Sequence, residues 1–407
     1  MIQAIKAKLI VTPGQAPIRD SAVIIKNNII EKIIPSTELK NNYYKIIDLK
    51  NSVILPGFIN SHIHLELHWV QKLLEPFKSF PSWLNQIIKL KKNFNNSKIP
   101  YWVNKSLNEC INSGVTTIGE ISSYDGLDYK PILDKKIRAV YFYELTNSTL
   151  KNIENKFFQS LIKNKPNPLI NFRIFPHSIY SLDTKSLKGI LAFAKKHNIK
   201  LGMHLSESID EVKYSKRKRN NFEDEVFSKT SHKPTIETKP TTPLEYLDTL
   251  NRNRQDITLI HMNNLSQNDF KILMKREYPV IICPRSNLYL NQKLPNIKFF
   301  MNYMKTGLGT DGLSSNLSIN FLDEINFLYL NAKKIINKAE EKILSIATIG
   351  GAKALGIDNE VGTIEIGKKA DIIAFDLINK NPYLSIIHSK KRNLKMSMIN
   401  GKIIKLR

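Results

Sequence analysis

Eight short apolar segments alternate with amphipathic, helix-like segments through the middle of this 407-residue chain. Strands that alternate with helices form a parallel sheet, because each helix carries the chain back to the end where the previous strand began. Eight such units predict an α/β fold, a closed (β/α)₈ TIM barrel over residues 53–361. The predicted strands are Val53–His64, Val115–Ile121, Arg138–Leu145, Asn171–His177, Lys200–Leu205, Thr258–His261, Val280–Pro284 and Thr306–Thr310.

Helix-start signals fall between these segments. Ser266 is a predicted N-cap with Asp269 at the third helical position, and Thr242-Pro243 opens another helix. The helical patterns include Ser82–Leu90, Trp102–Ile111, Thr184–His197 and Ser266–Arg276.

The two ends of the chain are rich in strand patterns instead. At the N-terminus these are Ala4–Val11, Ser21–Lys26 and Ile29–Ile34. Beyond Gly362 they are Gly362–Asp371, Ile372–Asp376 and a hairpin over Met398–Ile404 that turns at Asn400-Gly401. Because both sets flank the barrel, we predict that residues 1–52 and 362–407 meet as one composite small β domain, a β-sandwich.

Residues 209–240 are hydrophilic and charge-rich, with no clear period. We interpret them as a long loop on the barrel face. A mobile lid and a solvated insertion without function both remain open.

Composition narrows the class of protein. No apolar run approaches the ~20 residues of a membrane-spanning helix, and the N-terminus lacks a signal-peptide apolar region. The only cysteines are Cys110 and Cys283, so at most one disulfide is possible and a Cys-ligated zinc site is excluded. A cytoplasmic enzyme without a membrane partner fits best.

The net charge is +25, from 61 Lys+Arg against 36 Asp+Glu. Such an excess can indicate nucleic-acid binding. The lysines, however, are spread along predicted helix faces, without an aromatic-interleaved basic stripe. We therefore predict no nucleic-acid partner, and some electrostatic attraction for anionic small molecules.

Histidines stand at the ends of several predicted strands. His62 and His64 lie at i and i+2, so both point to one face of a strand and can reach one metal ion. A lone His-x-His is weak evidence. Functional groups of such barrels gather at the carboxyl ends of the strands, however, and further polar residues end later strands. These are His177, His204, His261 and Asp311. Imidazole and carboxylate ligands suit one divalent ion, Zn²⁺ or Fe²⁺.

Longer motifs surround these residues. They are Pro56–His64, His204-Leu205-Ser206-Glu207, Gly309-Thr310-Asp311-Gly312 and Gly362…Gly367-Lys368-Lys369-Ala370-Asp371. Taken together, the chain resembles the amidohydrolase superfamily, in the branch of cytosine, guanine, chlorotriazine and adenosine-type deaminases. The resemblance covers nearly the whole chain. The third strand ends around Glu144 with no lysine to bridge two metals, so a mononuclear site is expected.

Further motifs are most similar to those of the aminodeoxyfutalosine deaminases of menaquinone biosynthesis. They are His64-Leu65-Glu66, Phe80–Leu84, Ser113–Gly119 and Thr310–Asn316. The resemblance implies hydrolytic removal of the 6-amino group of an adenine nucleoside, with 6-amino-6-deoxyfutalosine the expected substrate. Alternatives with the same site are 5′-methylthioadenosine, S-adenosylhomocysteine, guanine or a chlorotriazine. An alternative of another class is a catalytically silent barrel that binds a ligand and no metal.

Carried over to this sequence, the resemblance implies four metal ligands: His62, His64, His204 and Asp311. Asp311 would also accept a proton from the attacking water and pass it to the departing ammonia. Glu207 would protonate the purine ring nitrogen beside the attacked carbon. His261 would orient the hydroxide as a hydrogen-bond donor.

Substrate contacts are expected from five further residues: Trp83, Glu144, His177, Arg285 and Ser286. The Arg285 guanidinium matches a carboxylate in bidentate fashion. It can equally bond a carbonyl at a strand end, and Trp83 can equally belong to the core. The sequence leaves the identity of the metal and the oligomeric state open, a homodimer being one option.

Overall fold

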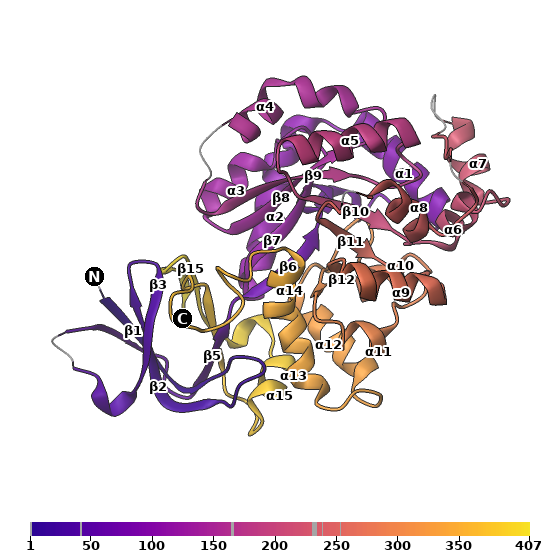
Figure 1. Cartoon of the computed structure of the whole chain (residues 1–407). Helices are drawn as coiled ribbons and strands as arrows, with labels where there is room; N and C mark the ends of the chain where they lie inside the picture. The colour runs from indigo at the N-terminus through magenta and orange to yellow at the C-terminus, as the bar shows by residue number, and fades with distance from the viewer. Residues whose placement is uncertain (1, 41–42, 164–166, 230–233, 238, 253) are drawn as a thin grey trace.

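Two β-sheets organise the molecule (Figure 1). The computed structural model describes residues 2–40, 43–163, 167–229, 234–237, 239–252 and 254–407. One sheet is parallel and carries most of the helices around it. The other lies beside it and is built from the two ends of the chain (Figure 1).

The parallel sheet contains eight strands that pair in sequence order. Its two edge strands meet through Asn60 and Thr310, whose side chains and backbone exchange hydrogen bonds of 2.8 and 3.0 Å. The Asp311 amide also donates to the His62 carbonyl at 3.0 Å. These contacts close the sheet, and the predicted (β/α)₈ barrel is confirmed. The strands are β6 (Phe58–Ile63), β7 (Val115–Ser122), β8 (Arg138–Leu145), β9 (Ile170–Pro176), β10 (Leu201–Leu205), β11 (Ile257–His261), β12 (Val280–Ile282) and β13 (Thr306–Leu308).

Helices cover the outside of this barrel. The predicted N-caps are confirmed, because Ser266 and Thr242 accept hydrogen bonds from the third helical residue of their helices. The α-helices are α1 (Phe80–Asn93), α2 (Ile99–Asn112), α3 (Tyr129–Lys135), α4 (Lys156–Lys163), α5 (Thr184–Lys196), α6 (Ile209–Ser215), α7 (Asn221–Glu225), α8 (Pro243–Leu250), α9 (Gln267–Arg276), α10 (Pro284–Tyr289), α11 (Ile297–Phe300), α12 (Phe321–Ala332), α13 (Ala339–Ser345), α14 (Gly351–Ala354) and α15 (Pro382–Ile387).

The second sheet is mixed and joins the two ends of the chain, as predicted. Its order is β16-β15-β14-β5-β1-β2-β3, and β4 pairs with β1 beside β5. The domain limits at residues 52 and 362 stay a prediction. The strands are β1 (Ile2–Ile10), β2 (Ile18–Lys26), β3 (Ile29–Pro35), β4 (Lys45–Asp48), β5 (Ser52–Pro56), β14 (Ile372–Asp376), β15 (Leu394–Ile399) and β16 (Lys402–Leu406).

The first barrel strand is shorter than expected. The apolar run Val53–His64 divides at Gly57: β5 belongs to the mixed sheet, and only β6 enters the barrel. A side chain on Gly57 would lie 2.0 Å from the Thr116 hydroxyl oxygen, so the chain crosses between the sheets where only glycine fits.

Two other expectations were wrong. Residues 362–371 form turns rather than a strand, because Gly362 and Gly367 adopt positive φ angles that interrupt a strand. The segment 209–240 contains α6 and α7 rather than one irregular loop, although residues 230–233 and 238 lie outside the described part. These helices have seven and five residues, too few for a period of 3.6 to be recognised. They bury Tyr214 and Phe222, and the short 3₁₀-helix that follows, Phe227–Lys229, buries Phe227.

A buried ion pair ties the barrel to the segment that leads into β14. Arg138 donates to both carboxylate oxygens of Asp371, at 2.7 and 3.2 Å, and both side chains are almost completely buried. Asp371, the last residue of the motif that runs from Gly362, therefore has a structural role.

We expect Asp371→Asn to destabilise the protein by roughly 1.5–3 kcal/mol, the range for hydrogen bonds to a charged group, because the buried Arg138 would keep only the partly exposed Glu360 carboxylate, at 3.2 Å, as a charged partner. Urea denaturation measures this loss. Asp376→Asn is the matched control: Asp376 pairs with Lys395 and Arg407 at a partly exposed site, where ion pairs contribute about 0–1 kcal/mol. Equal losses in the two variants would contradict the assignment.

Among the described residues, none of the helices combines the length and the apolar character needed to cross a membrane.

Candidate metal centre and active site

Four of the predicted ligands converge at the carboxyl ends of the barrel strands. The Nε2 atom of His62 lies 3.4 Å from Nε2 of His204 and 3.4 Å from Oδ1 of Asp311. The Nε2 atom of His64 lies 3.6 Å from the same Asp311 oxygen. His62 lies on β6 and His64 directly follows it, His204 lies on β10, and Asp311 follows β13.

The imidazole nitrogens and the carboxylate oxygen are better suited to bind a shared metal ion than to hydrogen-bond to one another. Within the described part of the chain, the Nδ1 atoms of His62, His64 and His204 have no hydrogen-bond partner, so no contact there fixes the tautomer. Burial lowers the pKa values of His64 and His204 well below the usual range, so both rings are neutral and offer a lone pair. Three imidazoles and a carboxylate are a donor set that Zn²⁺ and Fe²⁺ accept.

We expect His204→Ala to reduce the metal content of the purified protein from about one equivalent to a small fraction of it, because a ligand is lost. Elemental analysis of the protein measures this. His197→Ala removes an exposed histidine just after α5 and should retain the metal. Full metal retention by His204→Ala would remove His204 from the ligand set.

Asp311 is held in place by several contacts. Ser286 donates to its Oδ2 atom at 2.7 Å, and the Gly312 amide donates to Oδ1 at 2.9 Å. Asp311 has a φ of 60° and His261 a φ of 77°, values that cost roughly 1–3 kcal/mol in residues other than glycine. The surrounding bonds keep both side chains aimed into the barrel mouth.

Glu207 and His261 form a second pair beside the metal ligands. Glu207 Oε1 lies 3.4 Å from His261 Nε2, and both side chains are buried. Burial raises the pKa of Glu207 well above its usual value and lowers that of His261 to about 4. Burial therefore favours the protonated form of the carboxyl, and the ring is neutral at neutral pH.

A chain of hydrogen bonds fixes the tautomer of His261. The backbone carbonyl of Glu207 can only accept, and it accepts from the side-chain amide of Asn263 at 3.0 Å. Asn263 Oδ1 then accepts from Asn287 Nδ2 at 2.6 Å, which leaves Asn287 Oδ1 to accept from His261 Nδ1 at 3.2 Å. The proton of the neutral ring is thus on Nδ1, and Nε2 faces Glu207 as an acceptor. His261 can donate from Nε2 only when its ring is protonated.

Sequence reasoning missed two groups here, Asn263 and Glu211. Glu211 is fully buried and accepts the backbone N–H of Glu207 at 2.8 Å, which holds the turn after β10. In the sequence, the only indication of this role is that Glu211 follows Glu207 by four residues at the start of a helix.

Three buried carboxyl groups support the turn after His64: Glu66, Glu120 and Asp128. Glu120 accepts the Leu65 N–H, and Glu66 accepts the backbone N–H groups of Ser123 and Tyr124. Burial raises the pKa of Glu66 to about 8, so this group can be buried without a charge at neutral pH.

The residues expected to contact substrate lie in different surroundings. His177 Nε2 lies 4.0 Å from a Glu144 oxygen, and both side chains keep some exposure beside the metal ligands. Trp83 donates from Nε1 to the Ser314 carbonyl at 2.8 Å, which joins α1 to the loop after β13. Ser286 bonds Asp311, as described above.

The Arg285 side chain bonds within the protein. It donates to the Ser318 carbonyl at 3.1 Å and lies 3.7 Å from the buried Glu324 carboxylate. The contacts of Arg285 and of the four other residues with a substrate stay a prediction.

A (β/α)₈ barrel with imidazole and carboxylate groups at its mouth is typical of metal-dependent hydrolases. Residues 53–404 match the Amidohydrolase family, and the chain belongs to that family. It is a hydrolase that acts on C–N bonds.

Relatives and solved structures add the following likenesses. The chain is 28% identical to a 5'-deoxyadenosine deaminase of Methanobrevibacter smithii, over 93% of this chain and 84% of that protein. It is 28% identical to a 5-methylthioadenosine/S-adenosylhomocysteine deaminase of Thermococcus sibiricus, over 94% of this chain and 89% of that protein. The crystal structure of Helicobacter pylori aminofutalosine deaminase with methylthio-coformycin superposes with a TM-score of 0.85 and 24% identity, covering 98% of this chain and 99% of that one. This last likeness concerns the fold.

Proposed function

We propose that this protein is a metal-dependent hydrolytic deaminase that removes the 6-amino group of an adenine nucleoside. One observation carries the proposal: the buried carboxyl of Glu207, whose pKa burial raises well above its usual value, lies 3.4 Å from His261 beside the proposed metal ligands. A proton donor and a proton acceptor within one water-activating site are what hydrolysis of an aromatic amine requires.

A divalent ion held by His62, His64, His204 and Asp311 supplies activation of water at neutral pH. The residues of the chain supply the proton transfers. Water adds to C6 of the purine and ammonia leaves, so one proton goes to the ring nitrogen and another to the departing amine.

Glu207 is the group that donates to the ring nitrogen, because burial favours its protonated form. Asp311 accepts one proton of the attacking water and delivers it to the amine, while Ser286 holds its other oxygen. The second proton of the water leaves the added oxygen and returns to Glu207, so the protons balance. His261 Nε2 lies 3.4 Å from Glu207 Oε1 and positions the acid. When the ring is protonated, it can donate to the oxygen added at C6.

The candidate substrates fall into two groups. The first is 6-amino-6-deoxyfutalosine, which the motifs around His64, Phe80 and Thr310 support. The second is 5′-deoxyadenosine or 5′-methylthioadenosine, which the names of the relatives support. Both share adenine and a ribose without a free 5′-hydroxyl. We further propose Zn²⁺ or Fe²⁺ as the metal, and a cytoplasmic location.

The test is ammonia release by the metal-loaded protein from a panel of compounds. The panel contains 6-amino-6-deoxyfutalosine, 5′-deoxyadenosine, 5′-methylthioadenosine, S-adenosylhomocysteine, guanine and a chlorotriazine. We expect the highest kcat/KM with 6-amino-6-deoxyfutalosine. A higher value with another adenosine would change the substrate and keep the reaction. Turnover of guanine or the triazine alone would overturn the proposal.

A further inference from the structure

A cavity of about 300 Å³ lies at the amino ends of the barrel strands. Lys200 directly precedes β10, Asp256 precedes β11, and Lys305 precedes β13. His204 and His261 lie at the opposite ends of β10 and β11. The cavity is therefore at the far end of the barrel from the candidate metal centre.

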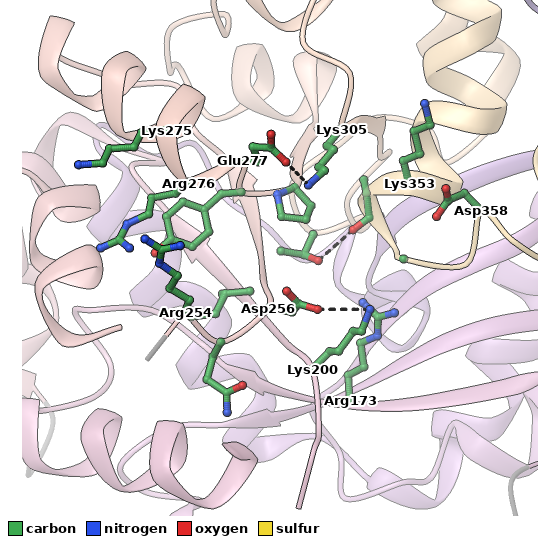
Figure 2. A pocket seen from close by; sticks show the side chains of 17 residues that line it. Arg173, Lys200, Arg254, Asp256, Lys275, Arg276, Glu277, Lys305, Lys353 and Asp358 are labelled. Carbon is green, nitrogen blue, oxygen red and sulfur yellow. Dashed lines mark hydrogen bonds and ion pairs between the residues drawn. The ribbon is translucent and has the colours of Figure 1, made fainter. Parts of the chain in front are cut away.

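The lining of this cavity is strongly basic (Figure 2). Three of its cations pair with carboxylates: Lys200 with Asp256 at 3.4 Å, Lys305 with Glu277 at 2.9 Å, and Arg276 with Asp248, which lies outside the lining, at 2.7 Å. The remaining lining carboxylate is Asp358. The lining cations number seven against three carboxylates, and they are Arg173, Lys200, Arg254, Lys275, Arg276, Lys305 and Lys353.

Four of these cations lack a carboxylate partner in the part of the chain that the structure describes. Arg173 is the most telling of them, because only 2% of its surface is exposed and the nearby Asp256 pairs with Lys200 instead. Its guanidinium donates from Nη2 to the Leu355 carbonyl and from Nε to Asn171 Oδ1 at 3.5 Å, which leaves the N–H groups of Nη1 to bond a ligand. Burial lowers the pKa of Arg173 to about 10, so it remains charged at neutral pH. The other three are Arg254, Lys275 and Lys353.

The backbone lies close to these charges. Gly356 has a φ of +56°, and a side chain there would meet Lys200 Nζ at 2.9 Å and Arg173 at 3.6 Å. Only glycine leaves this space beside the two cations open. In Figure 2, Arg173 and Lys200 extend together toward Asp256 from one side of the cavity.

We propose that this cavity binds a small phosphate-bearing molecule, at a site separate from the metal centre and independent of the proposed function. A guanidinium bonds phosphate in bidentate fashion, and neighbouring lysines add point charges. The volume is at the lower end of the range of about 300–1,000 Å³ for ligand pockets. Tyr278 is the single aromatic side chain of the lining, whereas sites for single-stranded nucleic acid stack successive bases on several aromatic rings.

The test is isothermal titration calorimetry of the metal-loaded, full-length protein with inorganic phosphate and with ribose 5-phosphate. We expect saturable binding of about one equivalent. Tighter binding of ribose 5-phosphate would identify an organic phosphate, and equal binding would identify free phosphate; both support the site.

Lys200→Gln/Lys353→Gln should weaken this binding at least tenfold. The matched control is Lys89→Gln/Lys334→Gln, which removes the same charge from exposed positions on α1 and in the turn after α12, outside the cavity, and should bind as the wild type does. Arg254→Gln, at an exposed side chain, gives a second variant with a smaller loss and little risk to folding.

Three results would overturn the proposal. They are the absence of saturable binding of either probe, an equal loss in the control variant, and binding of a short single-stranded RNA that depends on Lys200 and Lys353 when neither probe binds.

Discussion

Asp311→Asn is expected to lower kcat by roughly 10²–10⁴-fold, the contribution of a positioned acid–base group, while the protein stays folded. An amide oxygen can still accept the Gly312 N–H, and the amide nitrogen can donate to the Ser286 hydroxyl, which then acts as acceptor. The hydrogen bonds of residue 311 with Gly312 and Ser286 therefore survive. The amide cannot take up and release a proton at neutral pH, so the transfer from water to the departing amine is lost.

Ammonia release at saturating substrate measures this effect, together with metal content and the thermal unfolding midpoint. Asp323→Asn is the control, because Asp323 is an exposed carboxylate on α12. If Asp311→Asn keeps its metal and turns over near the wild-type rate, Asp311 does not transfer the proton.

Glu207→Gln should cause a loss of similar size, roughly 10²–10⁴-fold in kcat, for a different reason. Glutamine has nearly the same shape and can still bond the ring nitrogen, but it cannot transfer a proton to it. Glu207 is outside the proposed ligand set, so the variant should retain its full metal content. This retention separates the acid from the ligands, because His204→Ala is expected to lose both metal and activity.

The measurement is kcat in parallel with elemental analysis, and Glu38→Gln at an exposed position in the mixed-sheet region serves as control. Near-normal turnover by Glu207→Gln would eliminate its role as the acid. Loss of the metal would instead move Glu207 into the ligand set.

The convergence of the proposed metal ligands could be predicted from the sequence because each lies at, or just after, the carboxyl end of an apolar strand. In a parallel barrel, all such strand ends meet at one mouth, so position along a strand predicts position in space. His62, His204 and Asp311 are brought together in this way although long stretches of chain separate them.

The network around His261 could not be predicted in the same way. Asn263 follows β11 and Asn287 lies on α10, 24 residues further on, and no periodic pattern relates them. Arg285, also on α10, is a similar case, since its partner Glu324 lies on α12. Such contacts depend on how the helices pack against the barrel, which the alternation of strands and helices does not specify.

The boundary of the first barrel strand was missed because hydrophobicity is continuous across it. Val53 through Ile63 are mostly apolar, and the change of sheet is visible only at Gly57, where the Thr116 side chain leaves no space for a side chain.

The seam between the first and last strands has a consequence for how the enzyme matures. His62 and Asp311 come from the two strands that meet through Asn60 and Thr310, residues 250 positions apart in the chain. A nascent polypeptide that has emerged only through β12 holds three of the four proposed donors and lacks the fourth. Complete loading with metal must therefore wait until synthesis has passed residue 311 and the seam has formed, so metal uptake by a refolding sample would report the last stage of assembly.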